Sequence, residues 1–142
     1  MEAFETIRCR GHHYIQGTHP TTFEVTMDSC ITEKGHCIIG TCADKGAADL
    51  DPSFKKVLRR DDSVLLTQLS VGKCTVEVRS HGSFALLLTD EADHVWRKSR
   101  YICDRTVGIC SDYVAATLPR KLIKMLQAEN EMIVEMTAFT LE

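Results

Sequence analysis

The sequence predicts an α+β fold built from two similar halves, each with three strands, a helix and a fourth strand. Residues 41–58 and 109–126 align without a gap, and the offset of 68 residues is close to half of the 142-residue chain. The segments on either side also match in kind. Self-similarity of this sort predicts a repeated structural unit. The identical pairs are Cys42/Cys110, Asp44/Asp112, Ala47/Ala115, Ala48/Ala116, Leu50/Leu118, Lys56/Lys124 and Leu58/Leu126.

Eight segments have the β-branched composition or the alternation of β-strands. They are residues 4–11, 21–27, 37–43 and 63–71 in the first half and residues 74–82, 93–98, 105–110 and 132–141 in the second. We expect them to form a pseudo-twofold, strongly curved, mostly antiparallel sheet or barrel, because closure would protect the sheet edges. The expected unit is a single domain over 1–142, with repeat halves at about 1–70 and 71–142.

A short helix is expected before the last strand of each half. Pro52 and Pro119 suit the first helical turn, where a missing N–H costs nothing, and Asp51 can cap the first helix. Apolar residues at spacings of i, i+3 and i+4 give each helix one apolar stripe, with the basic residues on the opposite side. The stripes are Phe54, Val57 and Leu58 and then Leu122, Met125 and Leu126.

The composition, with 44% hydrophobic and 26% charged residues, is that of a globular protein. No apolar run approaches the roughly 18 residues of a membrane span, and the N-terminus lacks the apolar core of an export signal. We therefore expect a cytoplasmic monomer that does not bind membranes. The seven cysteines are expected to be reduced thiols, as is usual in the cytosol.

The net charge of −3 conceals three basic clusters, and an acidic protein can still present a basic face to nucleic acid. In residues 94–101, Trp96 and Tyr101 alternate with basic residues, a combination that contacts RNA by stacking on bases and pairing with phosphates. An edge strand with one buried tryptophan and a solvated basic flank explains that segment equally well. The residues expected to bind RNA or the ribosome are Lys55, Lys56, Arg59, Arg60, Trp96, Arg97, Lys98, Arg100, Tyr101, Arg105, Arg120, Lys121 and Lys124.

Motifs for catalysis or metal binding are weak. No C-x-x-C occurs, and the spacing of Cys37 and Cys42 would place them on opposite faces of a strand, so no metal and no cofactor is expected. A metal-dependent role for the histidines and cysteines stays open as a third interpretation. Asp44 and Asp112 are explained most simply as caps of the turns that follow them. Residues 11–24, GHHYIQGTHPTTFE, predict a polar surface site.

Three segments carry a resemblance to a known family: RGHHYIQGTHPTTFEVT from Arg10, GHCIIGTCADKGAADL from Gly35 and YICDRTVGICSDYVAATLPRKLI from Tyr101. They resemble the archaeal and eukaryotic family described as domain of unknown function 371, over nearly the whole chain. Outside the basic clusters, the resemblance singles out one polar set: His12, His19, Thr22, Glu24, Asp44 and Lys45. Cys37, Cys103 and Arg105 also match the family pattern. The second turn reads Ser111, Asp112 and Tyr113, which does not match the family's ADK-like turn.

The chain is also similar to microsporidian ribosome-dormancy factors, which occupy the exit-tRNA site of inactive ribosomes. That resemblance implies a ribosome-hibernation factor which contacts rRNA and ribosomal proteins and blocks translation, and which is not an enzyme. The alternative is a small cytosolic enzyme that acts on a phosphate-bearing or RNA-derived substrate. In that case His12, His19, Glu24 and Lys45 would be its acid–base or binding groups.

Overall fold

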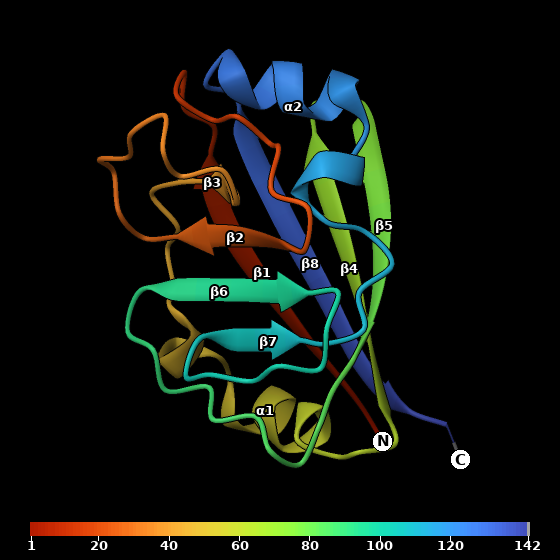
Figure 1. Cartoon of the computed structure of the whole chain (residues 1–142). Helices are drawn as coiled ribbons and strands as arrows, with labels where there is room; N and C mark the ends of the chain where they lie inside the picture. Colours follow the sequence, from red (N-terminus) through yellow and green to blue (C-terminus); the bar gives the residue numbers. More distant parts are fainter. Residues whose placement is uncertain (142) are drawn as a thin grey trace.

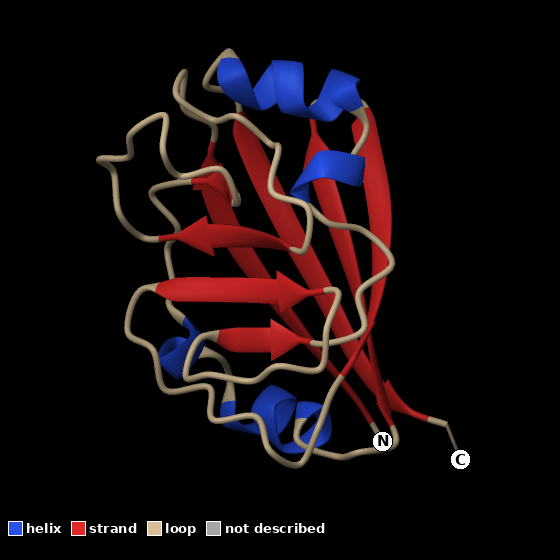
Figure 2. Cartoon of the chain, viewed as in Figure 1, coloured by secondary structure: helices blue, strands red, loops and turns tan. Residues whose placement is uncertain are grey.

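The computed structural model, which describes residues 1–141, has two four-stranded sheets and two short α-helices (Figure 1, Figure 2). The first half supplies β1 (Glu2–Arg10), β2 (Thr22–Thr26), β3 (Ile38–Gly40), α1 (Pro52–Leu58) and β4 (Ser63–Val71). The second half supplies β5 (Cys74–His81), β6 (Asp93–Arg97), β7 (Thr106–Gly108), α2 (Arg120–Gln127) and β8 (Glu131–Thr140). A short 3-10 helix precedes each α-helix, at Ala47–Asp49 and Ala115–Thr117. The predicted α+β class, with its eight strands and two helices, is therefore confirmed.

The order of strands confirms the predicted pseudo-twofold arrangement. The large sheet has the order β1-β8-β4-β5 and is antiparallel, while the small sheet has the order β3-β2-β6-β7, with parallel outer pairs around an antiparallel centre. The counterparts in the two halves are β1 and β5, β2 and β6, β3 and β7, and β4 and β8. When each strand is exchanged with its counterpart, both sheets keep the same strand order, read from the other edge. The pseudo-twofold axis passes between β2 and β6, where Glu24 lies opposite Val95 at the middle of both strands.

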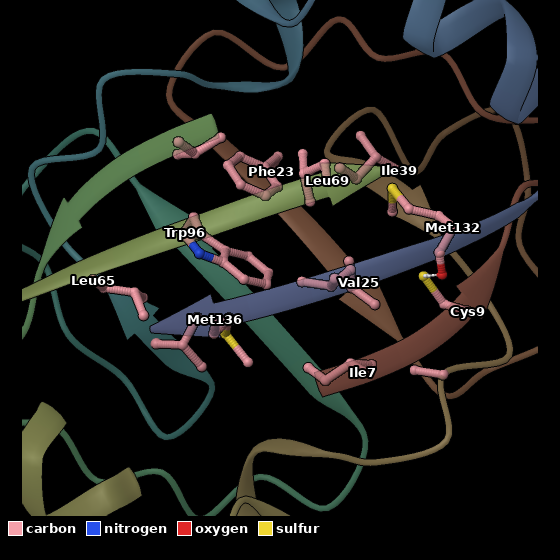
Figure 3. Close-up of a cluster of buried hydrophobic side chains, with 14 of the residues drawn as sticks. Ile7, Cys9, Phe23, Val25, Ile39, Leu65, Leu69, Trp96, Met132 and Met136 are labelled. Carbon is pink, nitrogen blue, oxygen red and sulfur yellow. Dashed lines mark hydrogen bonds between the residues drawn. The ribbon is translucent and has the colours of Figure 1, made fainter. Parts of the chain in front are cut away.

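The two sheets do not close into a barrel. They stack face to face with their strands crossing steeply, and α1 and α2 lie at opposite ends of the space between them (Figure 1). This layered packing buries one face of each sheet. Figure 3 shows the buried side chains that meet there, which include Phe23, Val25, Ile39 and Trp96 from the small sheet and Ile7, Leu65, Leu69, Met132 and Met136 from the large one.

The helices begin where proline and a capping residue predict, with one difference. Asp51 caps α1 by accepting the backbone N–H of Ser53 at 2.8 Å, and Pro52 is the first helical residue. Pro119 instead occupies the cap position of α2, because it aligns with Asp51 and not with Pro52. Both apolar stripes face the core. No helix within residues 1–141 is long and apolar enough to cross a membrane.

Candidate functional site on the outer face of the small sheet

Glu24 lies on the pseudo-twofold axis, on the face of the small sheet that points away from the core. Its neighbours along β2, Phe23 and Val25, point into the core, so the alternation of strand side chains turns Glu24 outward. Contacts with residues outside β2 nevertheless cover it, and only 5% of the residue is exposed. A buried carboxyl group in such a place requires partners.

Arg105, which immediately precedes β7, is the main partner of Glu24. Its Nη1 donates to Glu24 Oε1 at 3.0 Å and lies 3.5 Å from Asp93 Oδ2. Asp93 in turn accepts the Thr26 hydroxyl at 2.6 Å, and Cys37 Sγ lies 4.0 Å from Glu24 Oε1. Burial, and secondarily the Asp93 carboxylate, raise the pKa of Glu24 to about 7 against the opposing effect of Arg105. Glu24 can therefore gain or lose a proton near neutral pH.

A pocket of about 280 Å³ opens beside this cluster. This volume is at the small end of the range for ligand sites, so the pocket suits a small polar group. Its walls combine carboxylates and hydroxyls with a few apolar side chains: Glu24, Thr26, Asp28, Cys30, Ile31, Thr32, Gly35, Ile38 and Asp93.

The segment between β6 and β7, residues 98–105, is held at both ends by arginines. At one end Arg97 donates from Nε to Thr106 Oγ1 at 3.0 Å and from Nη2 to Cys103 Sγ at 3.3 Å. At the other end Arg105 pairs with the carboxylates of Glu24 and Asp93. The acidic cluster on the axis therefore positions the basic loop that follows β6.

Tyr101 is displayed by this loop. The guanidinium carbon of Arg97 lies 4.9 Å from the centre of its ring, and 64% of the tyrosine remains exposed. Lys98 and Arg100 on the same loop are also exposed. An exposed aromatic ring backed by arginine, with further cations beside it, can stack on a base and pair with phosphates.

Cys103 belongs to this loop, and its Sγ accepts hydrogen bonds from Arg97 Nη2 at 3.3 Å and from Thr106 Oγ1 at 3.6 Å. Burial raises the pKa of its thiol, but hydrogen bonds from the Arg105 backbone, from Thr106 and from Arg97 outweigh that effect and leave the pKa below its ordinary value. The thiolate form is therefore favoured more than in a free cysteine.

The polar set that the family resemblance singled out divides between several parts of the fold. Thr22 lies on β2 two residues before Glu24, on the same face of the sheet, and its Oγ1 lies 3.1 Å from His19 Nδ1. His12, Asp44 and Lys45 have their contacts elsewhere. His19 Nδ1 accepts the backbone N–H groups of Thr21 at 3.2 Å and Thr22 at 3.1 Å, and so holds the turn before β2. Lys45 forms an ion pair with the buried Glu5. Asp44 accepts the backbone N–H of Arg8 at 3.0 Å, which fixes the edge of the large sheet rather than the turn that follows Asp44.

His12 belongs to another cluster, near the end of α2. Its Nδ1 accepts the backbone N–H of Tyr14 at 3.0 Å, and its ring stacks on His13 with centroids 4.5 Å apart. His13 Nδ1 lies 2.8 Å from Glu129 Oε2. Within residues 1–141, these three side chains form the one group whose ligand atoms lie close enough for a metal, within 4.8 Å of one another. Both His12 Nδ1 and His13 Nδ1 are already engaged in hydrogen bonds.

The basic clusters do not form one continuous face either. The cluster of α1 and that of α2 lie at opposite ends of the molecule (Figure 1). Several of their side chains are engaged with the protein itself: Lys55 and Arg59 donate to carbonyl oxygens, as does Arg120, whereas Arg60 pairs with Asp62 at 3.0 Å. Lys56, Lys121 and Lys124 are exposed.

Trp96 needs a correction, because its ring is fully buried and offers no face to a base. It stacks on Phe23 with centroids 4.6 Å apart (Figure 3). Its Nε1 donates to Thr67 Oγ1 at 3.0 Å. The interpretation of residues 94–101 as an edge strand with a buried tryptophan is therefore right about the burial of Trp96 and wrong about the edge, because β6 lies between β2 and β7. Tyr101 is the aromatic residue of this segment that remains available.

Sequence reasoning missed three members of the site: Asp93, Cys103 and Thr106. Cys103 belongs to the family pattern and could have been selected together with Arg105, two residues later in the chain. Asp93 and Thr106 belong to no recognisable motif, and their role comes only from the pairing of β2 with β6 and β6 with β7.

Comparisons with known proteins agree on one family. The model of the family described as domain of unknown function (DUF371) matches residues 7–139. A protein of Methanocaldococcus jannaschii, described as uncharacterized, is 35% identical over 127 residues, which cover 89% of this chain and 93% of that protein. These matches give no support to the resemblance to ribosome-dormancy factors. The chain belongs to the DUF371 family.

Proposed function

We propose that this protein binds RNA through the loop between β6 and β7, and that the ribosome is where it does so. One observation carries the proposal: Tyr101 is 64% exposed, rests on the Arg97 guanidinium and is flanked by the exposed cations Lys98 and Arg100. Arg97 and Arg105 hold the loop in place before any ligand arrives, which lowers the entropic cost of binding.

The basic residues of α1 and α2 have a smaller part in this proposal. Because the helices lie at opposite ends of the molecule, one flat RNA surface could not reach both (Figure 1). A binding cleft that encloses the protein could, and the exit-tRNA site expected from the sequence is such a cleft.

The test compares the variant Lys98→Glu/Tyr101→Ala with the control Lys73→Glu/Phe4→Ala in co-sedimentation with ribosomes over a range of salt concentrations. The control removes the same charge and a ring of nearly the same exposure, 65% for Phe4, on another part of the surface. Wild type and control should sediment with ribosomes and detach as salt rises, since phosphate pairing releases counterions. The loop variant should bind at least about tenfold more weakly.

Arg97 is left out of this variant because it is not a free surface charge. Its hydrogen bonds to Thr106 and Cys103 hold the loop, so its reversal would disturb folding and binding together. If the folded loop variant sediments like the control, the loop is not the interface. If wild type fails to sediment at any salt concentration and also fails to bind single-stranded RNA, the function proposed here is wrong.

The alternative, an enzyme that acts on a phosphate-bearing substrate, is favoured by Glu24 alone. Its pKa of about 7 suits general acid–base catalysis at neutral pH, and the adjoining pocket of about 280 Å³ could admit a small group. Within residues 1–141, no hydrogen bond or ion pair joins Glu24 to His12, His19 or Lys45, whose side chains have other partners. Hydrolysis of phosphate esters that is abolished by Glu24→Gln would establish this alternative.

A further inference from the structure

A second pocket, of about 450 Å³, lies where the end of β5 meets the segment after β7 (Figure 1). His81 and Ile109 join the two segments through a pair of backbone hydrogen bonds of 2.8 and 3.0 Å. This volume falls within the range of pockets that hold small ligands. The pocket is lined by Asp61, His81, Gly82, Ser83, Arg100, Ile109 and Cys110.

The lining offers hydrogen-bond donors that the protein does not use. Among residues 1–141, no side chain or backbone group pairs with the guanidinium of Arg100 or the imidazole of His81. By contrast, the carboxylate of Asp61 is engaged, since its Oδ1 accepts the Phe84 backbone N–H at 2.7 Å and the Ser83 hydroxyl at 3.4 Å. The unsatisfied groups of the pocket are thus a cation and a histidine.

The wall of the pocket is fixed by close backbone packing. A Cβ atom at Gly82 would overlap Ser63 Oγ and the carbonyl oxygen of Leu58, so only glycine allows the chain to pass there. Cys110 has a φ of 52°, in the left-handed region that β-carbon-bearing residues rarely adopt. The pocket is therefore formed by the fold itself and needs no rearrangement.

The corresponding place in the first half shows which features are specific to this pocket. There Ser29 stands where the second half has Arg100, because the backbone N–H groups of Cys42 and Cys110 donate equivalent hydrogen bonds to the carbonyl oxygens of residues 28 and 99. Arg10, the counterpart of His81, already donates to the Glu129 carbonyl oxygen at 3.2 Å. A cation at the position of Arg100 is thus an addition of the second half and is not required by the fold.

We propose that this pocket binds a phosphate group through Arg100 and His81. Guanidinium is the side-chain group best matched to phosphate, and a histidine can donate to the same oxygens. Arg100 immediately precedes Tyr101, so a nucleotide whose phosphate enters the pocket could place a neighbouring base on the Tyr101 ring. The inference deepens the RNA-binding function proposed above and rests on it for the source of the phosphate, either the backbone of single-stranded RNA or a free nucleotide.

The experiment is a titration followed by ¹H–¹⁵N NMR, with inorganic phosphate, uridine monophosphate and a short oligouridylate as separate probes. In wild type we expect each probe to shift the backbone amides of Gly82, Ser83 and Cys110, and the oligouridylate to shift Tyr101 as well. Arg100→Ser, which copies the first half, and His81→Gln should each weaken phosphate binding by about tenfold. Lys73→Ser removes an exposed lysine elsewhere and should leave the affinity unchanged.

The outcomes separate this inference from the proposed function. Pocket shifts that sodium chloride reproduces at equal ionic strength, or that persist unchanged in Arg100→Ser, would overturn the phosphate site. If RNA binds but these amides do not move, the pocket inference is wrong and the RNA-binding function stands. If phosphate and uridine monophosphate bind in the pocket while RNA does not bind at all, the pocket stands with a free nucleotide as its ligand, and the RNA-binding function falls.

Discussion

The two halves of the molecule share a backbone plan and differ in where they place charge. In both, a glycine after the first strand passes against a helix carbonyl, at Gly11 and Gly82, and a cysteine has a left-handed φ, at Cys42 and Cys110. On the axis, however, Glu24 of the first half faces Val95 of the second. Close backbone contacts are thus repeated, while the polar groups of the candidate site are not.

This difference separates the residues that the shared fold requires from those that it leaves free for the binding proposed above. Groups that recur in both halves hold backbone segments together, because the same segments must meet twice. Groups found in one half only, such as the Glu24–Arg105 pair and Arg100, are not needed by the shared plan. Asymmetry within a symmetric frame is therefore a guide to function in this protein.

The strongest test of the shared plan is substitution of its two glycines. Gly11→Ala would drive a Cβ atom into the Leu126 carbonyl, and Gly82→Ala would do the same at Leu58, with backbone on both sides that cannot yield. Each variant should lose about 3 kcal/mol of unfolding free energy, measured by urea denaturation. Gly35→Ala is the control, since its nearest neighbour is the flexible end of Ile38. Tolerance of one glycine variant but not the other would show that the halves are not equivalent.

The axis itself can be tested through pH. Because the pKa of Glu24 is about 7 in the folded protein and ordinarily 4.5, its stabilising contribution is complete below pH 4.5 and is lost as the pH rises through 7. The loss in wild type should be on the order of 3 kcal/mol. The side chain of Glu24→Gln cannot ionise, so this variant should not lose that stability as the pH rises. Parallel stability curves for wild type and variant between pH 4.5 and 8 would contradict the assignment.

His94 and its counterpart Phe23 provide a second contrast within the same pair of strands. Burial lowers the pKa of His94 below its ordinary 6.5, against the opposing effects of the Lys45 carbonyl and nearby aspartates, and its Nδ1 is buried without a partner within residues 1–141. The neutral ring is thus favoured by folding, so stability should be present above pH 6.5 and be lost as the pH falls below it. In the His94→Phe variant, the midpoint temperature of thermal unfolding should fall less steeply as the pH drops below 6.5. If the midpoint temperature of this variant falls as steeply below pH 6.5 as that of wild type, the assignment of the acid-induced loss of stability to His94 is wrong.

The architecture could be predicted from the sequence because strands and helices depend on local patterns, and the repeat at residues 41–58 and 109–126 showed the symmetry. The division into two sheets could not, since it depends on which strands pair over long distances. For the site, the sequence selected Glu24 and Arg105 in two separate sets, and their contact could not be predicted because it joins residues 81 positions apart. Trp96 was misplaced because a single aromatic residue in a strand has no periodicity that shows which face it takes.

The smallest effect concerns Asp44 and Asp112, which tie the two edges of the large sheet to the loops. Each accepts a backbone N–H from an edge strand, that of Arg8 at 3.0 Å and that of Arg79 at 2.8 Å. Asp44→Ala and Asp112→Ala should each cost about 1 kcal/mol, the worth of one such hydrogen bond.

Since β1 and β5 are three strand spacings apart, about 14 Å, the costs of these two substitutions should add to within about 0.5 kcal/mol in the double variant. The matching asparagine variants keep the accepting oxygen and should stay near wild type in urea denaturation. Unequal costs for the two alanine variants would mean that one edge relies on other contacts. A double variant that loses much more than the sum would mean that the edges are coupled through the sheet, so that the two halves hold their shared plan jointly and not each by itself.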